Sequence, residues 1–363
     1  MVRVKPGEKG EWILLGREGI DNDGDGRINE DTEGYVDPNR NWAYNWAPNY
    51  IQSGAGYYPL SGTGLKAIAN FLLERPNVII VWAFHNAGGM FLRGPSTKDE
   101  AEFPSGDLKV YDYLGENSEM ITPGYQYLVL WKDLYATYGD FTGFTSNIIG
   151  SYGFVGELFQ SQTETYSMNE DLKKPGERNR EPGDGDSNHQ RLKFNDHVVQ
   201  GELYKPWTLY MHPVYGEIEI GGWTKMSSRL PHPFMLQDLV HRNASAVIFS
   251  AAQTPEIRVE LMERENIGKN LYRIRIRLLN DHATPTLTYQ SVKNKSHRKD
   301  VLKISGPSIQ VVAGGELMDA HMNQAVYKEH KPQIQFIHIP GFGKLEYQFL
   351  ISGKGTVKVN YSS

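Results

Sequence analysis

The chain has 363 residues and a formal net charge of −5 at pH 7, and it is rich in glycine, tyrosine and tryptophan but has no cysteine. The length allows two domains, and the missing cysteines exclude disulfides and thiolate metal sites. The scattered basic residues argue against binding to nucleic acid or to an anionic membrane surface. No apolar run approaches the roughly 20 residues that span a bilayer. We therefore expect a loop-rich globular enzyme or binding protein.

An acidic, glycine-containing stretch, GIDNDGDGRINED, lies near the start. It carries three carboxylates at alternate positions and a fourth further on: Asp21, Asp23, Asp25 and Asp31. Closely spaced carboxylates with a glycine that permits a sharp turn are typical of calcium loops. The usual closing glutamate is replaced by Thr32, so a loop would close on Asp31 or Glu30. Residues 21–31 are thus a candidate calcium site, with a solvated acidic turn as the alternative.

The next motif, VDPNRNW at 36–42, places Arg40 between two amides, Asn39 and Asn41. A guanidinium group is suited to bidentate binding of a carboxylate. The triplet therefore predicts a site for a free carboxyl end.

A helix and a strand are predicted after this motif. In SGTGLKAIANFLLERPN four apolar residues share one helical face, and Pro76 ends the helix. These residues are Leu65, Ile68, Ala69 and Leu72. The apolar run NVIIVWAFHNAGG lacks alternation, which is typical of a central strand buried on both faces. This strand ends at His85, in the position where open α/β sheets place their sites.

One of the following segments carries a glutamate among apolar residues. A helical segment is expected around EMITPGYQYLVLWKDLYATYG, and the strand-like run SYGFVGELFQ carries Glu157 among apolar neighbours. A buried, unpaired carboxylate costs several kcal/mol, so Glu157 needs a cation or a functional role. Residues 161–200 are polar and predict an exposed loop or insertion. A strand in HPVYGEIEIGGW and a helix in FMLQDLVHRNASAVIFSAA follow.

From residue 256 onward the apolar pattern has a period of two, as in LYRIRIRLLND, IQFIHIP, KLEYQFLI and TVKVNY. Short alternating strands without helices between them predict an antiparallel β-sandwich. We therefore expect an α/β domain of mixed sheet at 1–255 and a β-sandwich domain at 256–363.

Taken together, these motifs resemble the zinc metallocarboxypeptidases of the carboxypeptidase A/B type over residues 17–255, nearest to large bacterial members with an acidic loop and a β-domain. The resemblance implies that Asn39 and Arg40 bind the terminal carboxylate of a peptide or protein, that His85 is a zinc ligand, and that Glu157 is the general base. It also aligns Tyr135 with a tyrosine that caps the substrate, with Tyr138 as the fallback.

The same alignment makes two further assignments. It places Gly139 on a neighbouring glycine of the family and Thr142 on the residue that sets side-chain preference, which suggests neither a basic nor a large aliphatic preference. The family's secreted relatives imply a secreted or periplasmic full-length protein, although the first residues, MVRVKPGEKGEW, are no signal peptide.

Parts of the family pattern are missing. The chain has no His-x-x-Glu, which supplies the other two zinc ligands in the family, and no histidine before His85. His297 and Asp300 give the closest spacing, but they lie in the sandwich. The family's oxyanion-stabilising arginine has no secure match, since Arg3 and Arg17 are poor candidates. The opening strands of the sheet are absent too, so we expect exposed sheet edges and apolar faces.

Three interpretations remain open. The chain is the carboxyl-terminal part of a larger carboxypeptidase that starts inside the catalytic domain, or an inactive paralogue that binds peptide ends or glycans, or one of two chains that share the zinc ligands. Glu217 and Glu219 are alternative bases, for which a structural role is nearer. His212 and His232 lie in His-Pro turns and are expected to be structural.

Overall fold

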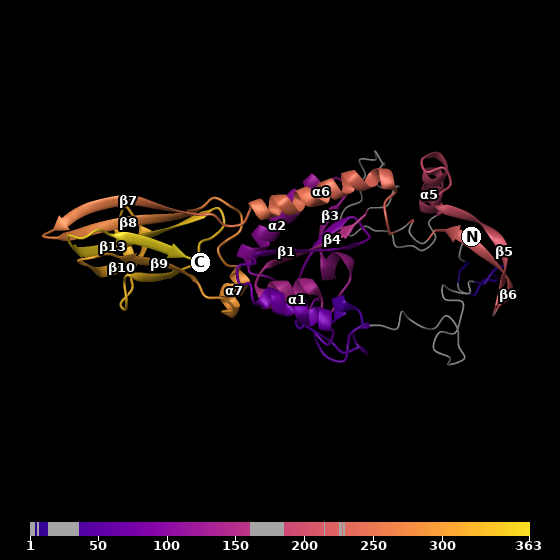
Figure 1. Cartoon of the computed structure of the whole chain (residues 1–363), viewed down its shortest axis with the longest axis horizontal. Helices are drawn as coiled ribbons and strands as arrows, with labels where there is room; N and C mark the ends of the chain where they lie inside the picture. The colour runs from indigo at the N-terminus through magenta and orange to yellow at the C-terminus, as the bar shows by residue number, and fades with distance from the viewer. Residues whose placement is uncertain are drawn as a thin grey trace.

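The computed structural model describes residues 4–5, 7–13, 36–159, 185–213, 215–224, 227 and 229–363, and for 185–190 it describes the backbone only. The candidate calcium loop at 21–31 lies outside the described residues. The described chain forms a mixed α/β layer structure, followed by an antiparallel β-sandwich (Figure 1). This confirms the fold class expected from the sequence. None of the described helices is long and apolar enough to cross a membrane.

The α/β part is built on a four-stranded mixed sheet in the order β1-β4-β2-β3. Its strands are β1 (Ile80–Asn86), β4 (Tyr152–Leu158), β2 (Met90–Arg93) and β3 (Gln126–Val129). Strand β4 pairs in parallel with β1 and antiparallel with β2, and β2 pairs in parallel with β3. The carboxyl end of β4 therefore lies beside the end of β1 and the start of β2.

Helices cover both faces of this sheet. Helix α1 (Thr63–Leu73) lies on one side, whereas α2 (Ser105–Ile121) and α6 (Pro233–Ala252) lie on the other (Figure 1). Three of the four predicted core residues of α1 are buried, but Ile68 is 49% exposed. Short helical segments complete this part: η1 (Pro38–Arg40), η2 (Leu130–Leu134), α3 (Phe141–Phe144) and η3 (Thr145–Ile149).

Two predictions about these elements are wrong. The stretch expected to be helical around residues 119–139 contains the end of α2, strand β3 and the short segment η2, because Pro123-Gly124 interrupts the helix and the apolar run that follows pairs with β2. Strand β1 is not central. Its one partner among the described strands is β4, and its residues are partly exposed.

The open side of β1 matches the expected exposure of sheet edges. Phe84 of β1 is 45% exposed, and on the neighbouring helix α6 the side chains of Val240 and Ile248 are 57% and 68% exposed. Apolar side chains on an edge strand and on the helix above it therefore face solvent.

A small unit follows the α/β sheet in the chain and comprises α5 (Gly185–His197) and the two-stranded sheet of β5 (Tyr204–His212) and β6 (Gly216–Trp223). Helix α5 falls in the stretch predicted to be a loop, so that prediction is wrong for residues 185–197. The predicted strand in HPVYGEIEIGGW is confirmed as β6. The carboxylates of Glu217 and Glu219 lie on this hairpin, which projects away from the mixed sheet (Figure 1).

The sandwich consists of a five-stranded and a three-stranded antiparallel sheet, in the orders β11-β10-β13-β8-β7 and β12-β9-β14. The alternating residues of β8 point into its core, where Ile274, Ile276 and Leu278 are buried. A short helix, α7 (Tyr289–Asn294), interrupts the strands, contrary to the prediction of no helices. The strands are β7 (Ile257–Gly268), β8 (Leu271–Asn280), β9 (Asp300–Ser305), β10 (Ile309–Asp319), β11 (Gln324–Tyr327), β12 (Ile334–Ile337), β13 (Gly343–Gly353) and β14 (Lys358–Ser362).

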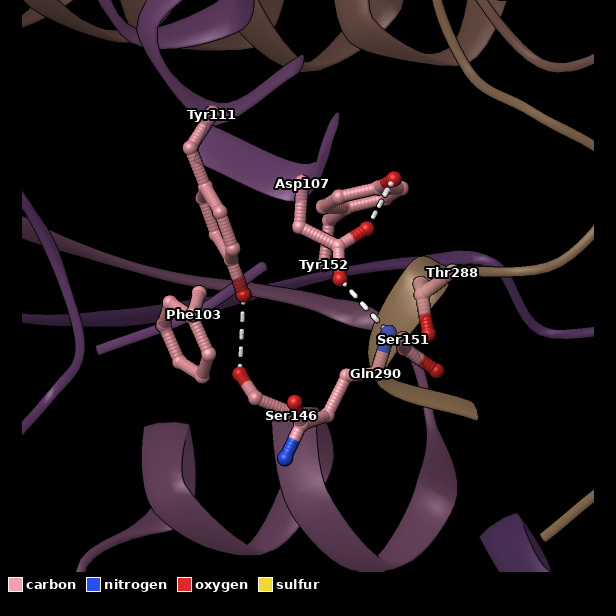
Figure 2. Close-up of a pocket in the computed structure, with 8 residues that line it drawn as sticks. All are labelled: Phe103, Asp107, Tyr111, Ser146, Ser151, Tyr152, Thr288 and Gln290. Carbon is pink, nitrogen blue, oxygen red and sulfur yellow. Dashed lines mark hydrogen bonds between the residues drawn. The ribbon is translucent and has the colours of Figure 1, made fainter. Parts of the chain in front are cut away.

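Helix α7 joins the sandwich to the α/β part through a buried carboxylate, Asp107 of α2 (Figure 2). Asp107 accepts hydrogen bonds from the backbone N–H of Tyr289 at 2.9 Å and of Gln290 at 2.7 Å, and from the hydroxyl of Tyr152 at 2.7 Å. The backbone N–H groups of a first helical turn lack partners within the helix. Asp107 therefore satisfies the start of α7 and fixes it against β4.

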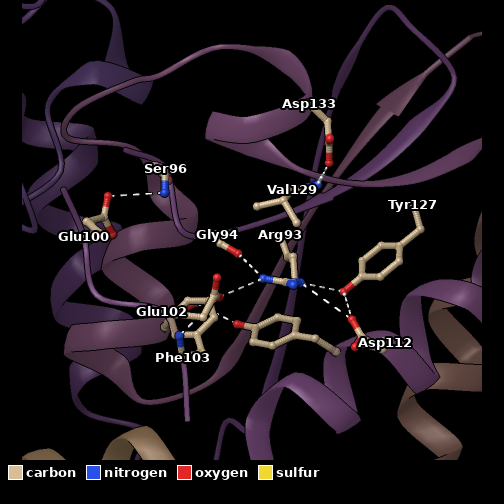
Figure 3. A network of polar contacts seen from close by, with 12 residues as sticks. Arg93, Gly94, Ser96, Glu100, Glu102, Phe103, Asp112, Tyr127, Val129 and Asp133 are labelled. Atoms are coloured by element: carbon tan, nitrogen blue, oxygen red, sulfur yellow. Dashed lines mark hydrogen bonds and ion pairs between the residues drawn. The ribbon is translucent and has the colours of Figure 1, made fainter. Parts of the chain in front are cut away.

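A second buried charge, Arg93, lies at the carboxyl end of β2 and joins this strand to β3 and α2 (Figure 3). Its guanidinium group donates to the hydroxyl of Tyr127 at 2.8 Å and to the carbonyl of Gly94 at 2.7 Å, and it forms ion pairs with Glu102 and Asp112. Because an unpaired buried cation is costly, these partners are needed for Arg93 to be accommodated.

Candidate functional site

The Asn-Arg-Asn motif forms a rigid turn. Pro38 begins the single turn η1, and the carboxylate of Asp37 accepts the backbone N–H of Asn39 at 2.7 Å. Asn41 is fully buried, and its side chain bonds to Ser61 and to the backbone N–H of Gly56. The second amide of the motif is therefore structural, and it anchors the turn that presents Asn39.

The side chains of Asn39 and Arg40 are oriented by their own hydrogen bonds. The side-chain oxygen of Asn39 accepts the backbone N–H of Phe141 at 2.9 Å, which leaves its amide NH2 to donate to a ligand. Arg40 donates to the carbonyl of Asn39 at 2.7 Å and to the hydroxyl of Tyr135 at 3.4 Å. Its remaining N–H groups can bind a carboxylate.

A glycine brings a second loop against this turn. Gly139 has φ +64°, and a Cβ atom there would lie 2.7 Å from the carbonyl oxygen of Arg40. Its own carbonyl accepts the backbone N–H of Trp42 at 2.8 Å. Only glycine combines this left-handed backbone with such a close approach. The loop that carries Tyr135 is thereby held beside Arg40.

The strands supply the other end of the site. His85 of β1 and Glu157 of β4 are paired in the parallel register, close to the carboxyl ends of both strands. The turn after β1 is tied back to β4, since Gly89 donates its backbone N–H to the carbonyl of Glu157 at 2.8 Å. The sequence thus places an imidazole and a carboxylate side by side on a rigid sheet.

Partial burial raises the pKa of the Glu157 carboxyl above its ordinary value of 4.5. Three nearby groups act in the opposite direction and lower this pKa, in decreasing order His85, Arg229 and Arg40. A carboxyl group whose pKa is moved toward neutrality is a better general base or acid at physiological pH. The chemistry expected of Glu157 is therefore compatible with its surroundings.

These groups line one open cavity of about 120 Å³. Asn39, Arg40 and Tyr135 line it together with His85 and Glu157, so the structure brings all five into one pocket. The remaining lining residues are Asp37, Leu92, Leu130, Leu134, Thr137 and Val155. Four of these are aliphatic, but Leu92, Leu130 and Val155 are almost wholly buried, so the accessible lining of the cavity is mainly polar.

Two further predicted residues lie outside the lining of this cavity. The backbone N–H of Tyr138 donates to the side chain of Gln52, beside the pocket. Thr142 is buried, and its hydroxyl donates to Asp140 and contacts the hydroxyl of Ser96. Tyr135 is therefore better placed than Tyr138 to contact a ligand, and Thr142 is bonded within the protein.

The residues expected to hold zinc do not form a complete metal site. The part of the chain that the structure describes contains no group of three or more histidine, aspartate, glutamate or cysteine side chains that could hold an ion. A catalytic zinc takes three protein ligands, so the described residues do not fit it. His85 would need two ligands other than those described.

Two other histidines make contacts within the fold. The imidazole of His297 bonds to the carbonyl of Ile149 at 2.6 Å, which ties the sandwich to η3. His232 precedes α6 and pairs with Glu202 at 3.1 Å. The carboxylate of Asp300 accepts the hydroxyl of Tyr361 at 2.7 Å. These contacts agree with the structural role expected for His232.

The sequence alone does not indicate the aliphatic lining residues or Arg229. In the sequence the aliphatic residues lie in separate apolar segments, and their convergence depends on the order of the strands in the sheet. Arg229 is distant in sequence from the motifs, and no local pattern marks it. Its contact with Asn86, the residue after His85, is formed only in the folded chain.

A family model described as a domain of unknown function (DUF8731) matches residues 256–363. No curated protein matches the chain. Among solved structures, the chain is similar to thrombin activatable fibrinolysis inhibitor (TAFI), with 19% identity, a TM-score of 0.29 and coverage of 34% of each chain. The chain thus spans about a third of the length of that structure. What the pocket can bind is therefore inferred from the residues that line it, and not from this structural similarity.

Proposed function

We propose that the pocket binds the carboxyl end of a peptide or protein, with Asn39 and Arg40 holding the terminal carboxylate. One observation carries this proposal: Asn39, Arg40 and Tyr135 line the same cavity as His85 and Glu157. A carboxylate bound at Arg40 would leave the last peptide bond directed toward Glu157. The pocket-bearing part, 1–255, and the sandwich, 256–363, are proposed as the two domains.

The aliphatic lining residues suggest which terminal residue the pocket accepts. Leu92, Leu130, Leu134 and Val155 line the pocket, and Leu134 is the most exposed of them, because the other three are at most 6% exposed. Burying a charged side chain against these groups would be costly, whereas an aliphatic side chain can contact them without losing a polar partner. The proposed ligand is therefore a peptide that ends in an aliphatic residue such as leucine. This differs from the preference that the family resemblance suggests through Thr142, which is bonded to Asp140 and does not line the pocket.

Calorimetric titration with a leucine-terminated peptide tests the proposal. The free acid should bind at least about tenfold more tightly than the matching carboxyl-terminal amide, because a charge-assisted hydrogen bond contributes about 1.5–3 kcal/mol. Arg40→Gln should remove most of this difference. Arg75→Gln, which changes a surface arginine next to Glu74, is the matched control. Equal affinity for acid and amide would reject carboxylate recognition.

A second candidate function, hydrolysis of the last peptide bond, is favoured by the pairing of Glu157 with His85. In this proposal Glu157 takes a proton from a water molecule, the water oxygen attacks the carbonyl carbon, and the proton passes to the leaving amine. Since the described residues do not complete a zinc site, no step is assigned to a metal.

Release of leucine from the same peptide tests this second function. The assay would be run with and without added zinc, with elemental analysis of the dialysed protein. Turnover that is lost in Glu157→Gln would support hydrolysis. Tight binding without turnover would leave a binding protein for carboxyl ends and reject hydrolysis by this chain.

A further inference from the structure

Thr137 lines the pocket with a hydroxyl group that the fold leaves unpaired. The residue is 2% exposed and belongs to the lining of the cavity. Among the described residues its hydroxyl oxygen has no hydrogen-bond partner. Buried polar groups in folded proteins are nearly always hydrogen-bonded, and an unpaired one destabilises the fold. A ligand in the cavity can supply the partner that this hydroxyl lacks.

The backbone fixes the place of this hydroxyl. The N–H of Thr137 donates to the carbonyl of Ser96 at 2.9 Å, and the N–H of Trp131 donates to the carbonyl of Pro95 at 3.4 Å. Segment 131–137 is therefore bound at both ends to the residues that follow β2. Because a β-branched side chain has few favourable χ1 rotamers, the hydroxyl is held in the cavity wall with little freedom to turn away.

Thr137 belongs to the buried side of the cavity. Tyr135, two residues earlier, is 46% exposed, whereas Thr137 is buried like three of the aliphatic lining residues. These are Leu92, Leu130 and Val155, each at most 6% exposed. Within the described lining, Thr137 alone has a buried polar side-chain atom without a partner. A ligand side chain on this side of the cavity therefore meets aliphatic groups and one hydroxyl.

We propose that Thr137 is a specificity-determining residue that hydrogen-bonds a hydroxyl group on the terminal side chain of the bound peptide, so that threonine is preferred to valine. This inference rests on the proposed function of the pocket. It narrows the ligand from an aliphatic residue to an aliphatic residue that also carries a hydroxyl group.

The chemistry of the two side chains supports this choice. Threonine has the branched shape of valine, with one methyl group replaced by a hydroxyl, so it keeps an aliphatic part for the leucines and the valine of the lining. A hydroxyl group can both donate and accept, so it can pair with Thr137 in either direction. A site that hydrogen-bonds a ligand hydroxyl discriminates against the analogue that lacks it, because the polar group of the site is then left unpaired.

Two ligands of the same shape test the proposal. N-acetyl-threonine and N-acetyl-valine share the carboxylate, the amide and the branched side chain, and differ in a hydroxyl against a methyl group. Their dissociation constants would be measured by NMR titration for the wild type, Thr137→Val, Thr137→Ser, Arg40→Gln and Thr122→Val. Thr122 is the matched control. It is 1% exposed and its hydroxyl has no partner within the described chain, but it does not line the pocket.

The wild type should bind N-acetyl-threonine about three- to tenfold more tightly than N-acetyl-valine, the ratio expected for one hydrogen bond. Thr137→Val should abolish this preference, whereas Thr137→Ser, which keeps the hydroxyl, and Thr122→Val should retain it. Arg40→Gln should weaken both ligands to the same extent.

Equal affinity of the wild type for the two ligands, or a preference for N-acetyl-threonine that persists in Thr137→Val, would overturn the role of Thr137. In both cases a loss of binding in Arg40→Gln would leave the proposed function of the pocket intact. If neither ligand depended on Arg40, the proposed function itself would be overturned.

Discussion

His85 and Glu157 occupy paired positions on the parallel strands β1 and β4. The pairing continues along both strands from Ile80 and Tyr152, so their relative position is fixed by sheet hydrogen bonds. In a parallel pair, residues opposite each other place their side chains on the same face of the sheet. An imidazole and a carboxylate held in this way are pre-organised, with little conformational entropy left to lose when a ligand binds.

Glu157→Gln should have opposite effects on function and stability. Any turnover that depends on Glu157 as a base should be lost, and in the wild type it should fall on acidification through a pKa above 4.5. Because burial raises the pKa in the folded state, the ionised carboxylate destabilises the fold at higher pH. The variant should therefore melt at a higher temperature than the wild type at pH 7.5, with the difference vanishing below pH 4.5. A variant that melts lower at pH 7.5 would contradict this.

Gly139→Ala should destabilise the chain by about 1–3 kcal/mol and weaken binding of peptide ends. The added Cβ atom would meet the carbonyl of Arg40 and would also require a left-handed alanine. Gly201→Ala is the matched control, because Gly201 has φ +86° but no atom within 4 Å of its Cβ position. Urea denaturation of both variants would separate the cost of the contact with Arg40 from the cost of a left-handed alanine. An equal loss of stability in both would show that the contact with Arg40 adds nothing.

Asp107→Ala should lower the free energy of unfolding by about 3 kcal/mol or more. It removes the acceptor of the two backbone N–H groups of α7 and of the Tyr152 hydroxyl, and each unpaired buried group costs about 1–3 kcal/mol. Asp238→Ala, which breaks an exposed pair with Arg242, should cost less than about 1 kcal/mol. Thermal and chemical unfolding would measure both, and a neutral Asp107→Ala would show that α7 is not held by this carboxylate.

Arg93→Met should destabilise the mixed sheet by about 2–4 kcal/mol, since the hydroxyl of Tyr127 and the carbonyl of Gly94 lose a buried donor. Arg75→Met removes an exposed arginine that lies over Phe71 and should cost less than about 1 kcal/mol. The denaturation midpoints of Arg93→Met and Arg75→Met would be compared to measure the two losses of stability. If the two variants were equally stable, the network around Arg93 would not support the sheet.

The sequence was most informative where the pattern is local. The 3.6 period of α1 and the period of two in β8 identified their buried faces, because each depends only on which side chains face the core. The motif around Arg40, the end of β1 and the acid in β4 were also visible as local features. Their convergence in one pocket could be expected only from the family resemblance, since it depends on the order of the strands.

Other features could not be predicted because they depend on distant contacts. The apolar run of β1 indicated burial on both faces, yet the described sheet leaves one side of the strand open. The separation of helix α2 from strand β3 depends on pairing with β2, whose four residues form too short a pattern to recognise. Arg229 became visible only through its bonds to Asn86.

Within the described sheet β1 has one open side, and this side has a consequence for how the chain behaves at high concentration. Unpaired backbone groups on an apolar edge strand are a template for pairing with another chain. With Phe84, Val240 and Ile248 exposed nearby, such contacts would also bury apolar surface. Self-association through this edge would therefore grow with protein concentration and compete with the folded monomer, while charged substitutions at Val240 and Ile248 would favour a soluble form without touching the pocket.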